Sequence, residues 1–296
     1  MEIKQLMTFQ KAAEQLNFTR TAEQLNFAQS SVTGHIKSLE DELGVPLFDR
    51  LGKSLKLTEA GRTLLHYANR IIRLTSEAGQ AISEEKGPAG LLVIGTSESL
   101  CTYRLPPVLS AFSHRYPKVR FHFLPDTSDR DIIKLLAGGK MDVAVLMDAG
   151  KDLRLFNICP LQKEKIVLVA SADHQLAALR SVGPEELYKE PLLLTEKDCS
   201  YRRNLDRILS SNQLIPEQVS EFASVEAIKQ CVISGLGVAA LPEMTVHKEI
   251  LDGTIKVLPW TGDPMYIQPC MVWLKDKWVS PALSAFLTLT QQHLQN

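Results

Sequence analysis

The first part of the chain carries apolar side chains at helical spacing, interrupted by short polar corners. From Phe9 to Leu16 they recur every three or four positions, which is the spacing of one buried helix face. The hexapeptide Ala-Glu-Gln-Leu-Asn-Phe then occurs twice, ending at Phe18 and at Phe27. Asparagine tolerates the left-handed conformation at helix ends, so each Asn-Phe pair predicts the end of a short helix.

Two of these helices are predicted to meet at a tight corner. Thr19 is a suitable cap for a helix over residues 20–25. A corner at residues 26–28 separates it from a helix that begins at Gln29, whose apolar face is Val32, Ile36, Leu39 and Leu43. A helix, a corner of about three residues and a second helix form a helix-turn-helix unit.

A two-stranded wing is predicted directly after this unit. Gly44 and Pro46 end the preceding helix. Leu55 and Leu57 alternate with polar side chains as in a half-buried strand. The pair Gly52-Lys53 would form the tip of the wing and place a cation there.

A long helix is predicted from Thr58 to about Lys86. Small or apolar residues recur at alternating steps of four and three, at Leu64, Ala68, Ile71, Thr75, Ala78 and Ile82. This heptad pattern is typical of a helix that packs along another helix, and at ~1.5 Å per residue the helix would be about 40 Å long. The alternative is a surface helix that packs on its own domain. The sequence Gly-Pro-Ala-Gly over residues 87–90 predicts a linker after it.

From Leu91 onward, predicted strands and helices alternate. The first series has strands at residues 91–95, 119–124 and 141–146 with helices between them, which is typical of a parallel sheet covered by helices. A second series has strands at residues 166–170, 192–194, 219–222 and 238–241. A strand at 271–274 and a helix from Pro281 are expected to return to the first lobe. We therefore expect an α/β domain with one lobe at 91–162 and 269–296 and a second at 163–268.

Composition and charge narrow the class of protein. Of 296 residues, 45% are apolar and 23% are charged, with a net charge of -1, which fits an ordinary globular protein and excludes a disordered or collagen-like chain. Neither a signal-peptide core nor an apolar stretch of ~18–20 residues is present, so we expect a cytoplasmic protein without a membrane anchor. The five cysteines show no Cys-x-x-Cys spacing, which favours reduced thiols and no zinc site; no cofactor is expected.

The chain resembles LysR-type transcriptional regulators over essentially its whole length. At the amino terminus the resemblance rests on a dense set of residues: Phe9, Ala12, Ala13, Phe18, Thr19, Ala22, Leu25, Gln29, Ser30, Ser31, Val32, Thr33, Ile36, Leu39, Glu40, Leu43, Gly44, Leu47, Phe48, Arg50 and residues 57–61, Leu-Thr-Glu-Ala-Gly. In the second half it rests on the stretch from Ser234 to Pro242, which reads Ser-Gly-Leu-Gly-Val-Ala-Ala-Leu-Pro.

This resemblance implies a domain plan and a set of partners. The plan is an α-helix-rich winged helix-turn-helix DNA-binding domain (1–58), a linker and dimerisation helix with a hinge (59–90), and a two-lobed α/β effector-binding domain like type 2 periplasmic binding proteins (91–296). The implied partners are double-stranded promoter DNA, a small-molecule effector, RNA polymerase, and further copies of the chain in a dimer through the linker helix and a tetramer. The protein would be no enzyme and would lie on the nucleoid while bound to DNA. Two positions depart from the family pattern: Thr21 replaces a common alanine, and Gly34 lies inside the second helix.

The chemistry of DNA contact is predicted from geometry, because charge does not indicate it. Residues 1–58 hold seven Lys or Arg and seven Asp or Glu. The start of the second helix of such a unit reaches base edges in the major groove, where glutamine pairs with adenine and hydroxyls serve several bases. Basic side chains near it fit phosphates. The predicted DNA-binding residues are Arg20, Thr21, Gln29, Ser30, Ser31, Thr33, Gly34, His35, Lys37, Arg50 and Lys53. The alternative is a solvated polar face.

The effector cleft is predicted at the carboxyl ends of the strands, where helices begin and ligands of parallel sheets bind. Hydroxyl-bearing segments follow the first two strands of one lobe and a strand of the other, and they suit a small anion, most simply a carboxylate. The candidates are Ser97, Glu98, Ser99, Cys101, Thr127, Thr195, Cys199, Ser200, Tyr201 and Ser224. The alternative is plain helix capping by serine and threonine.

Two cysteines open matching segments of the two lobes. Cys101-Thr-Tyr-Arg and Cys199-Ser-Tyr-Arg each follow a predicted strand, so both thiols are expected to line the cleft. A thiolate at a helix amino terminus near arginine has a lowered pKa, which makes thiol-based redox sensing an alternative function; two small buried side chains are the other interpretation. A solute-binding protein and a thiol enzyme using Cys199 with His174 or His122 are the alternatives from other classes.

Overall fold

The structure is a computed structural model that describes residues 1–51, 54–82, 87–124, 128–150 and 153–295. It contains two compact units. One takes in Met1–Lys86 with the short stretch Gly138–Lys140, and the other takes in Gly87–Ala137 and Met141–Asn296.

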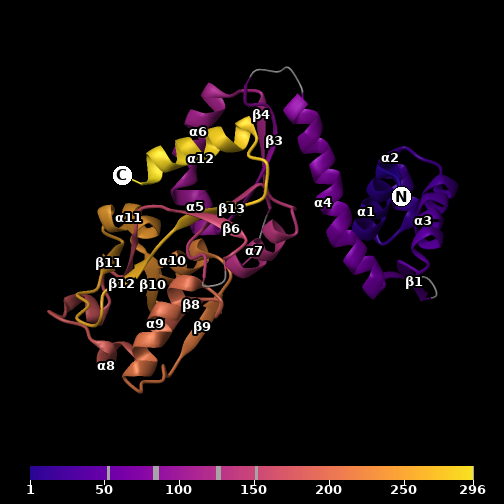
Figure 1. The fold of residues 1–296 in the computed structure, drawn as a ribbon. Helices are drawn as coiled ribbons and strands as arrows, with labels where there is room; N and C mark the ends of the chain where they lie inside the picture. Colours follow the sequence, from indigo (N-terminus) through magenta and orange to yellow (C-terminus); the bar gives the residue numbers. More distant parts are fainter. Residues whose placement is uncertain (52–53, 83–86, 125–127, 151–152, 296) are drawn as a thin grey trace. The chain divides into compact units, whose positions relative to one another are not determined.

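The first unit is a winged helix-turn-helix followed by a long helix (Figure 1). Its elements are α1 (Ile3–Gln15), α2 (Phe18–Leu25), α3 (Gln29–Leu43), β1 (Phe48–Leu51), β2 (Ser54–Leu57) and α4 (Glu59–Ile82). The wing strands pair antiparallel, with Phe48 opposite Leu57. The helix-turn-helix and the wing predicted from apolar spacing are therefore confirmed.

The corners of this unit use asparagine in two different ways. Asn26 has a φ of 53° and ends α2 in the left-handed region, as predicted. Asn17 instead begins α2, because its side-chain oxygen accepts from the backbone N–H groups of Thr19 (2.9 Å) and Arg20 (3.1 Å). The prediction that Thr19 caps this helix was wrong: Thr19 is already inside its first turn, where its N–H is one of the free donors that a cap must satisfy.

A small aromatic core holds the helices and the wing together. The rings of Phe9 and Phe18 meet that of Phe48 edge-on, with centroids 5.5 Å and 5.3 Å away. Gly61, in the first turn of α4, passes so close to the chain that an added Cβ would lie 2.1 Å from the carbonyl oxygen of Leu47. Only glycine allows this approach, which fixes α4 against the wing.

The apolar stripe of α4 divides into two parts. Leu64 and Ala68 are buried in the core of the first unit, so here the helix packs on its own domain. Further along, Thr75 and Ala78 are exposed and Ile82 is 81% exposed, and Leu74, which lies beside the stripe, is 54% exposed. Within the described chain, the second part of the stripe thus presents apolar side chains to solvent.

The second unit has two lobes, each built on a mixed sheet. Lobe 1 has the strand order β4-β3-β5-β13-β6, with β3 (Gly90–Thr96), β4 (Val119–Leu124), β5 (Val143–Leu146), β6 (Phe156–Pro160) and β13 (Cys270–Leu274). Lobe 2 has the order β11-β7-β10-β8-β9, with β12 also paired to β7; these strands are β7 (Glu164–Ser171), β8 (Leu192–Thr195), β9 (Val219–Phe222), β10 (Val238–Pro242), β11 (Ile255–Val257) and β12 (Met265–Ile267).

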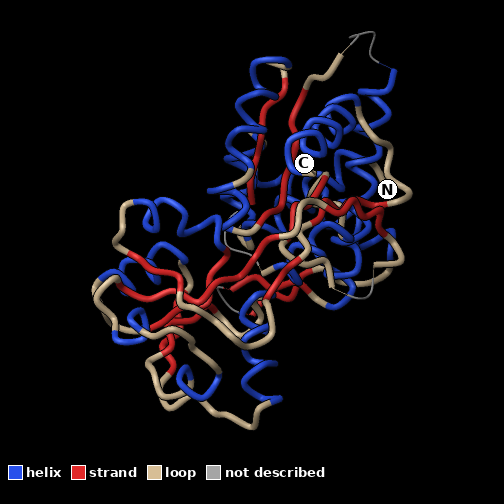
Figure 2. The backbone as a smooth tube through the Cα atoms, turned by 90° about the vertical axis from the view of Figure 1, so that its left-hand side faces the viewer, coloured by secondary structure: helices blue, strands red, loops and turns tan. Residues whose placement is uncertain are grey.

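Helices flank both sheets, as the tube view shows (Figure 2). They are α5 (Glu98–Tyr103), α6 (Leu105–Arg115), α7 (Asp129–Ala137), α8 (Pro184–Leu187), α9 (Ser200–Ser211), α10 (Val225–Ile233), α11 (Glu243–Leu251) and α12 (Pro281–Leu294), with a 3-10 turn η1 (Gln175–Ala178). Within the described ranges, no helix is long and apolar enough to cross a bilayer.

The predicted parallel pairing is confirmed for β3 with β4 and β5, and for β8 with β9 and β10. Two strands depart from it. β13 runs antiparallel to both β5 and β6, and β7 runs antiparallel to β10. The chain passes from lobe 1 to lobe 2 between β6 and β7, and it returns between β12 and β13. As a result, β7 and β13 each enter their sheet from the other lobe. Apolar periodicity locates a strand but carries no information on its direction, so the sequence pattern could not show this.

Candidate functional site

Helix α3 presents one polar face and buries the other. Val32, Ile36 and Leu39 are fully or almost fully buried, which fixes the rotation of the helix about its axis. Five predicted DNA-binding positions lie on the exposed side: Gln29, Ser30, Ser31, Gly34 and Lys37. Arg20, near the start of α2, is exposed as well.

Contacts with Thr8 and Phe27 hold the side chain of His35 in place. Its ring nitrogen Nδ1 lies 2.9 Å from the hydroxyl oxygen of Thr8, and that hydroxyl donates to the backbone carbonyl of Lys4 (2.9 Å). The hydroxyl has a single hydrogen, so the network assigns the ring proton to Nδ1 and leaves Nε2 as the acceptor nitrogen of the neutral ring. The ring of Phe27 meets the imidazole edge-on at 5.9 Å. The half-buried imidazole is thus oriented before any ligand arrives.

Other predicted contact positions have different surroundings. Thr21 is 0% exposed, and its hydroxyl donates to the backbone carbonyl of Asn17 (2.8 Å). The prediction that Thr21 contacts DNA was therefore wrong, because its side chain packs inside the domain. Thr33 is half-buried and donates its hydroxyl to the carbonyl of Gln29 (3.0 Å). Lys53 lies outside the described residues, and so does the side chain of Arg50.

Gly34 lies in regular helix on the exposed side of α3. An added Cβ there would have no atom of the domain within 4 Å. The absence of a side chain is thus not required by packing within the first unit. It leaves the helix backbone accessible at this point of the polar face.

A cavity of about 550 Å³ lies between the lobes of the second unit. Residues from both lobes line it: Thr96, Ser97, Glu98, Ser99, Cys101, Thr102, Phe123, Leu124, Ser128, Asp129, Met147, Thr195, Glu196, Asp198, Cys199, Ser200, Tyr201, Phe222, Ala223 and Val225. Its volume is in the range of small-molecule sites.

Eight of the ten predicted effector residues line this cavity: Ser97, Glu98, Ser99, Cys101, Thr195, Cys199, Ser200 and Tyr201. Ser224 is not among the lining residues, although its neighbours Ala223 and Val225 are. It caps α10 instead, and its hydroxyl accepts from the N–H of Ala227 (3.5 Å). Thr127 lies outside the described residues.

The start of each lobe-2 helix at the cavity meets a carboxylate from lobe 1. Glu98 accepts from the hydroxyl of Ser224 (3.2 Å) and from the backbone N–H of Val225 (3.1 Å), at the start of α10. Asp129 accepts from the side chain of Ser200, at the start of α9. Negative charge is favourable at a helix amino terminus, so these two contacts hold the lobes against each other.

Asp129 is one of the lining residues that were not predicted from the sequence. Burial raises the pKa of its carboxyl to about 6, and the charge of Asp148 adds to the increase, while hydrogen bonds from the Asp148 backbone and Ser200 and the charge of Arg203 act against it. The segment could have been found from the sequence, because an acidic helix start follows the second strand. The aromatic side chains Phe123 and Phe222 were missed too, since strand ends were searched only for polar residues.

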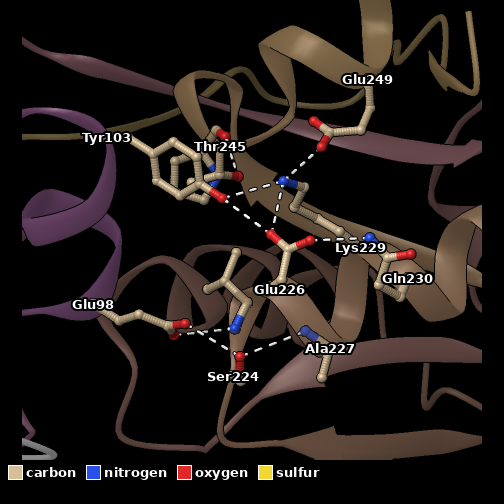
Figure 3. A network of polar contacts seen from close by, with 11 residues as sticks. Glu98, Tyr103, Ser224, Glu226, Ala227, Lys229, Gln230, Thr245 and Glu249 are labelled. Atoms are coloured by element: carbon tan, nitrogen blue, oxygen red, sulfur yellow. Dashed lines mark hydrogen bonds and ion pairs between the residues drawn. The ribbon is translucent and has the colours of Figure 1, made fainter. Parts of the chain in front are cut away.

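A second group of contacts joins the lobes beside the cavity (Figure 3). The Nζ atom of Lys229 donates to the hydroxyl of Tyr103 on lobe 1 (3.1 Å), and it pairs with the carboxylates of Glu226 (3.0 Å) and Glu249 (2.7 Å) on lobe 2. Lys229 is 3% exposed. Buried lysine keeps its charge only with such partners, and their hydrogen bonds outweigh burial and raise its pKa.

The two cleft thiols differ from the expectation of lowered pKa. Burial raises the pKa of both Cys101 and Cys199, although Cys199 stands at the start of α9. The loss of hydration of the thiolate exceeds the favourable effect of the helix start. The alternative of thiol-based redox sensing is therefore disfavoured, because the fraction of reactive thiolate near neutral pH is small.

Two family models match the chain. Residues 3–62 match "Bacterial regulatory helix-turn-helix protein, lysR family", and residues 85–295 match "LysR substrate binding domain". A similar curated protein is YwqM of Bacillus subtilis, an uncharacterised helix-turn-helix transcriptional regulator, at 46% identity over 99% of both chains.

Solved structures share the fold over the whole chain. Full-length OxyR of Pseudomonas aeruginosa superposes with a TM-score of 0.76 at 22% identity, covering 99% of this chain and 94% of the other. Full-length CbnR in complex with its target DNA superposes with a TM-score of 0.70 at 20% identity, covering 99% of this chain and 100% of the other. Identities this low support the fold alone.

Proposed function

Because this chain belongs to the LysR family of bacterial transcriptional regulators, we propose a division of roles between its two units. The chain is a DNA-binding transcriptional regulator with an effector-binding domain, and the relatives compared with it are regulators rather than enzymes. In the proposal, α3 reads promoter DNA and the interlobe cavity receives the effector.

The observation that carries the DNA-binding role is the two-sided burial of α3. Its apolar side is locked into the core, so five polar or small positions face outward together, and His35 is oriented beside them. Residues at the start of such a helix contact base edges. We propose Gln29, Ser30, Ser31, Thr33, Gly34 and His35 for the groove, and Arg20 and Lys37 for phosphates. Arg50 and Lys53 of the wing stay predictions for phosphate contact.

Assembly follows from the exposed part of the stripe on α4. We propose that two copies pair through Leu74, Ala78 and Ile82, because solvent-exposed apolar residues on one helix face gain most from a second helix. Such a dimer presents two α3 helices to two half-sites of a promoter. Further assembly into a tetramer, contact with RNA polymerase and a cytoplasmic location on the nucleoid complete the proposal.

We assign effector sensing to the interlobe cavity. It lies between two lobes and is lined by residues of both, so a ligand that binds one arrangement of the lobes more tightly shifts the population toward that arrangement. No observation favours redox sensing as a second function, because burial raises the pKa of Cys101 and Cys199. DNA binding by the Cys101→Ala and Cys199→Ala variants should therefore respond to an oxidant no differently from that of the unaltered chain.

A gel-shift assay tests the function. The full chain should bind a promoter fragment from its own genomic neighbourhood more tightly than random duplex, and both affinities should fall steeply with salt as phosphate contacts release counterions. Equal and salt-independent affinity for both fragments would contradict the proposal.

A further inference from the structure

The charged side chains among the described residues that line the interlobe cavity are all acidic. Four carboxylates line it, Glu98 and Asp129 from lobe 1 and Glu196 and Asp198 from lobe 2, and among the described lining residues there is no lysine or arginine. A cavity walled by charges of one sign concentrates ligands of the opposite sign. The expectation of a carboxylate effector therefore meets an unfavourable field here.

Two of the helix starts at the cavity already meet a carboxylate of lobe 1. The carboxylate of Glu98 accepts from the backbone N–H of Val225 at the start of α10, and that of Asp129 accepts from Ser200 at the start of α9. Among the described residues Glu98 forms no ion pair, and its partners are an uncharged hydroxyl and a backbone N–H. A ligand carboxylate would have to displace one of these side chains.

The cation near Asp129, the guanidinium of Arg203, pairs with other groups. Arg203, whose charge acts on Asp129, pairs with Asp148 (3.3 Å) and donates to the backbone carbonyl of Asp198 (2.9 Å). In the part of the chain that the structure describes, no ion pair within 4 Å engages the Asp129 carboxylate. Burial raises its pKa to about 6, which is the behaviour of a carboxylate that lacks a counter-charge.

Other groups of the lining also suit a cation. The hydroxyl oxygens of Ser97 and Thr195 are buried and have no hydrogen-bond partner among the described residues, and Thr195 as a whole is 8% exposed. Each offers lone pairs to a donor, and an ammonium group carries three donors and no acceptor. The aromatic side chains of Phe123, Phe222 and Tyr201 add ring faces, which attract cations.

We infer that the effector is a small organic cation whose ammonium or guanidinium group is received by Glu98 and Asp129, with its apolar part against the aromatic side chains of the cavity. This inference rests on the proposed function, because it takes the cavity to be the effector site. A cation there compensates the negative charge of Glu98 and Asp129 without removing either carboxylate from its helix start.

The test uses pairs of probes with the same skeleton and opposite charge. The full chain is heated with putrescine or succinate, and with phenethylamine or 3-phenylpropanoate, each at about 10 mM and equal ionic strength, because a ligand of the folded state raises the melting temperature by mass action. At least one amine should raise the melting temperature, and the carboxylate of the same skeleton should not. Glu98→Gln and Asp129→Asn should each weaken amine binding at least tenfold, measured by calorimetry.

Glu217→Gln is the matched control, since this exposed residue precedes β9 at the strand end away from the cavity; it should leave amine binding unchanged. A larger shift with a carboxylate, no shift with either amine, or amine binding that survives both variants would overturn the inference. Gel shifts with promoter DNA on the same protein keep the two proposals distinct. If the protein still binds DNA but gives any of these results, only the cationic effector is rejected. If the unaltered chain does not bind DNA, the proposed function is rejected.

Discussion

The imidazole of His35 and the hydroxyl of Thr8 are 2.9 Å apart, and they join the outer side of α3 to the middle of α1. Because the Thr8 hydroxyl donates to the carbonyl of Lys4, the histidine ring is fixed in both orientation and tautomer. A ring fixed in this way loses little freedom when it meets a base edge, which favours a role in reading sequence.

We expect His35→Ala to weaken binding to the target promoter by about 1–3 kcal/mol, the range of a good base contact, and binding to random duplex by much less. Thr8→Val keeps the ring but removes its anchor, so it should cause a smaller loss of the same kind. Lys37→Ala is the control, since an exposed phosphate contact lowers both affinities alike and makes the salt dependence shallower. Equal losses on both duplexes in His35→Ala would reject the reading role.

Gly34→Ala should separate stability from DNA binding. Glycine inside a helix costs ~1 kcal/mol relative to alanine, and an added Cβ meets no atom of the domain within 4 Å, so the variant should unfold at higher urea concentration. Its methyl group would project from the polar face of α3, where the proposed DNA surface lies. A gel shift should therefore show weaker promoter binding by the more stable protein. Unchanged binding would place Gly34 outside the contact surface.

Much of the fold follows from the sequence because its signals are local. The turn between α2 and α3, the wing and the strand ends of lobe 2 each depend on a few neighbouring residues, and the structure confirms them. The burial of Thr21 depends instead on how α2 packs against α1 and α3, which the residues of α2 alone do not show. In the same way, the antiparallel course of β13 is set by a return from the other lobe, and no pattern within residues 270–274 encodes it.

The sequence predicted the position of the cavity better than its charge and the pKa values of its thiols. Hydroxyl side chains after parallel strands locate the edge of a sheet where ligands bind, and most of the residues chosen on that ground line the cavity. The charge of the site depends on Asp129, Glu196 and Asp198, which only the folded chain brings together. The thiol pKa values likewise depend on burial, which outweighs the helix start at Cys199.

Asp129→Asn should raise stability at neutral pH. The pKa of Asp129 is about 6 in the folded chain against an ordinary value of 3.8, so ionisation above pH 6 disfavours the folded state, and this cost disappears as pH falls from 6 to below 3.8. The groups that act on it are Asp148, Ser200, Arg203 and Cys270. The variant should therefore be more stable than the unaltered chain by about 1–3 kcal/mol at pH 7.5, with little difference near pH 4.

Urea unfolding across this pH range measures the effect. Asp131→Asn is the control from the same helix, because Lys134 and Ser128 lower the pKa of this exposed carboxyl. Its pH dependence should have the opposite sign, with stability lost on removal of the charge. A stability difference for Asp129→Asn that does not change with pH would contradict the argument.

The buried ammonium of Lys229 should matter more for stability than for the contact between lobes. Lys229→Met leaves Glu249, whose side chain is 14% exposed, without its cation, and we expect a loss of about 3 kcal/mol in the free energy of unfolding. Tyr103→Phe removes the hydroxyl, which accepts from Lys229 and donates to Glu226 (3.4 Å) across the lobes, but it leaves the ion pairs of Lys229 in place. The loss should therefore be about 1–2 kcal/mol. Lys248→Met, at an exposed position of α11, should change little. A Tyr103→Phe loss equal to that of Lys229→Met would mean that the lobe contact dominates.

The exposed stripe of α4 should control assembly. Leu74→Glu places a charge on a surface that is 54% exposed in the single chain, so it should cost the monomer little, whereas a paired helix would have to bury that carboxylate. We expect the dimer dissociation constant to rise at least tenfold in sedimentation experiments, with promoter affinity falling because one half-site is lost. Arg70→Gln changes the charge by the same amount at an exposed position of the same helix and should leave both quantities unchanged. Assembly that resists Leu74→Glu and Ile82→Glu alike would move the dimer interface away from this stripe.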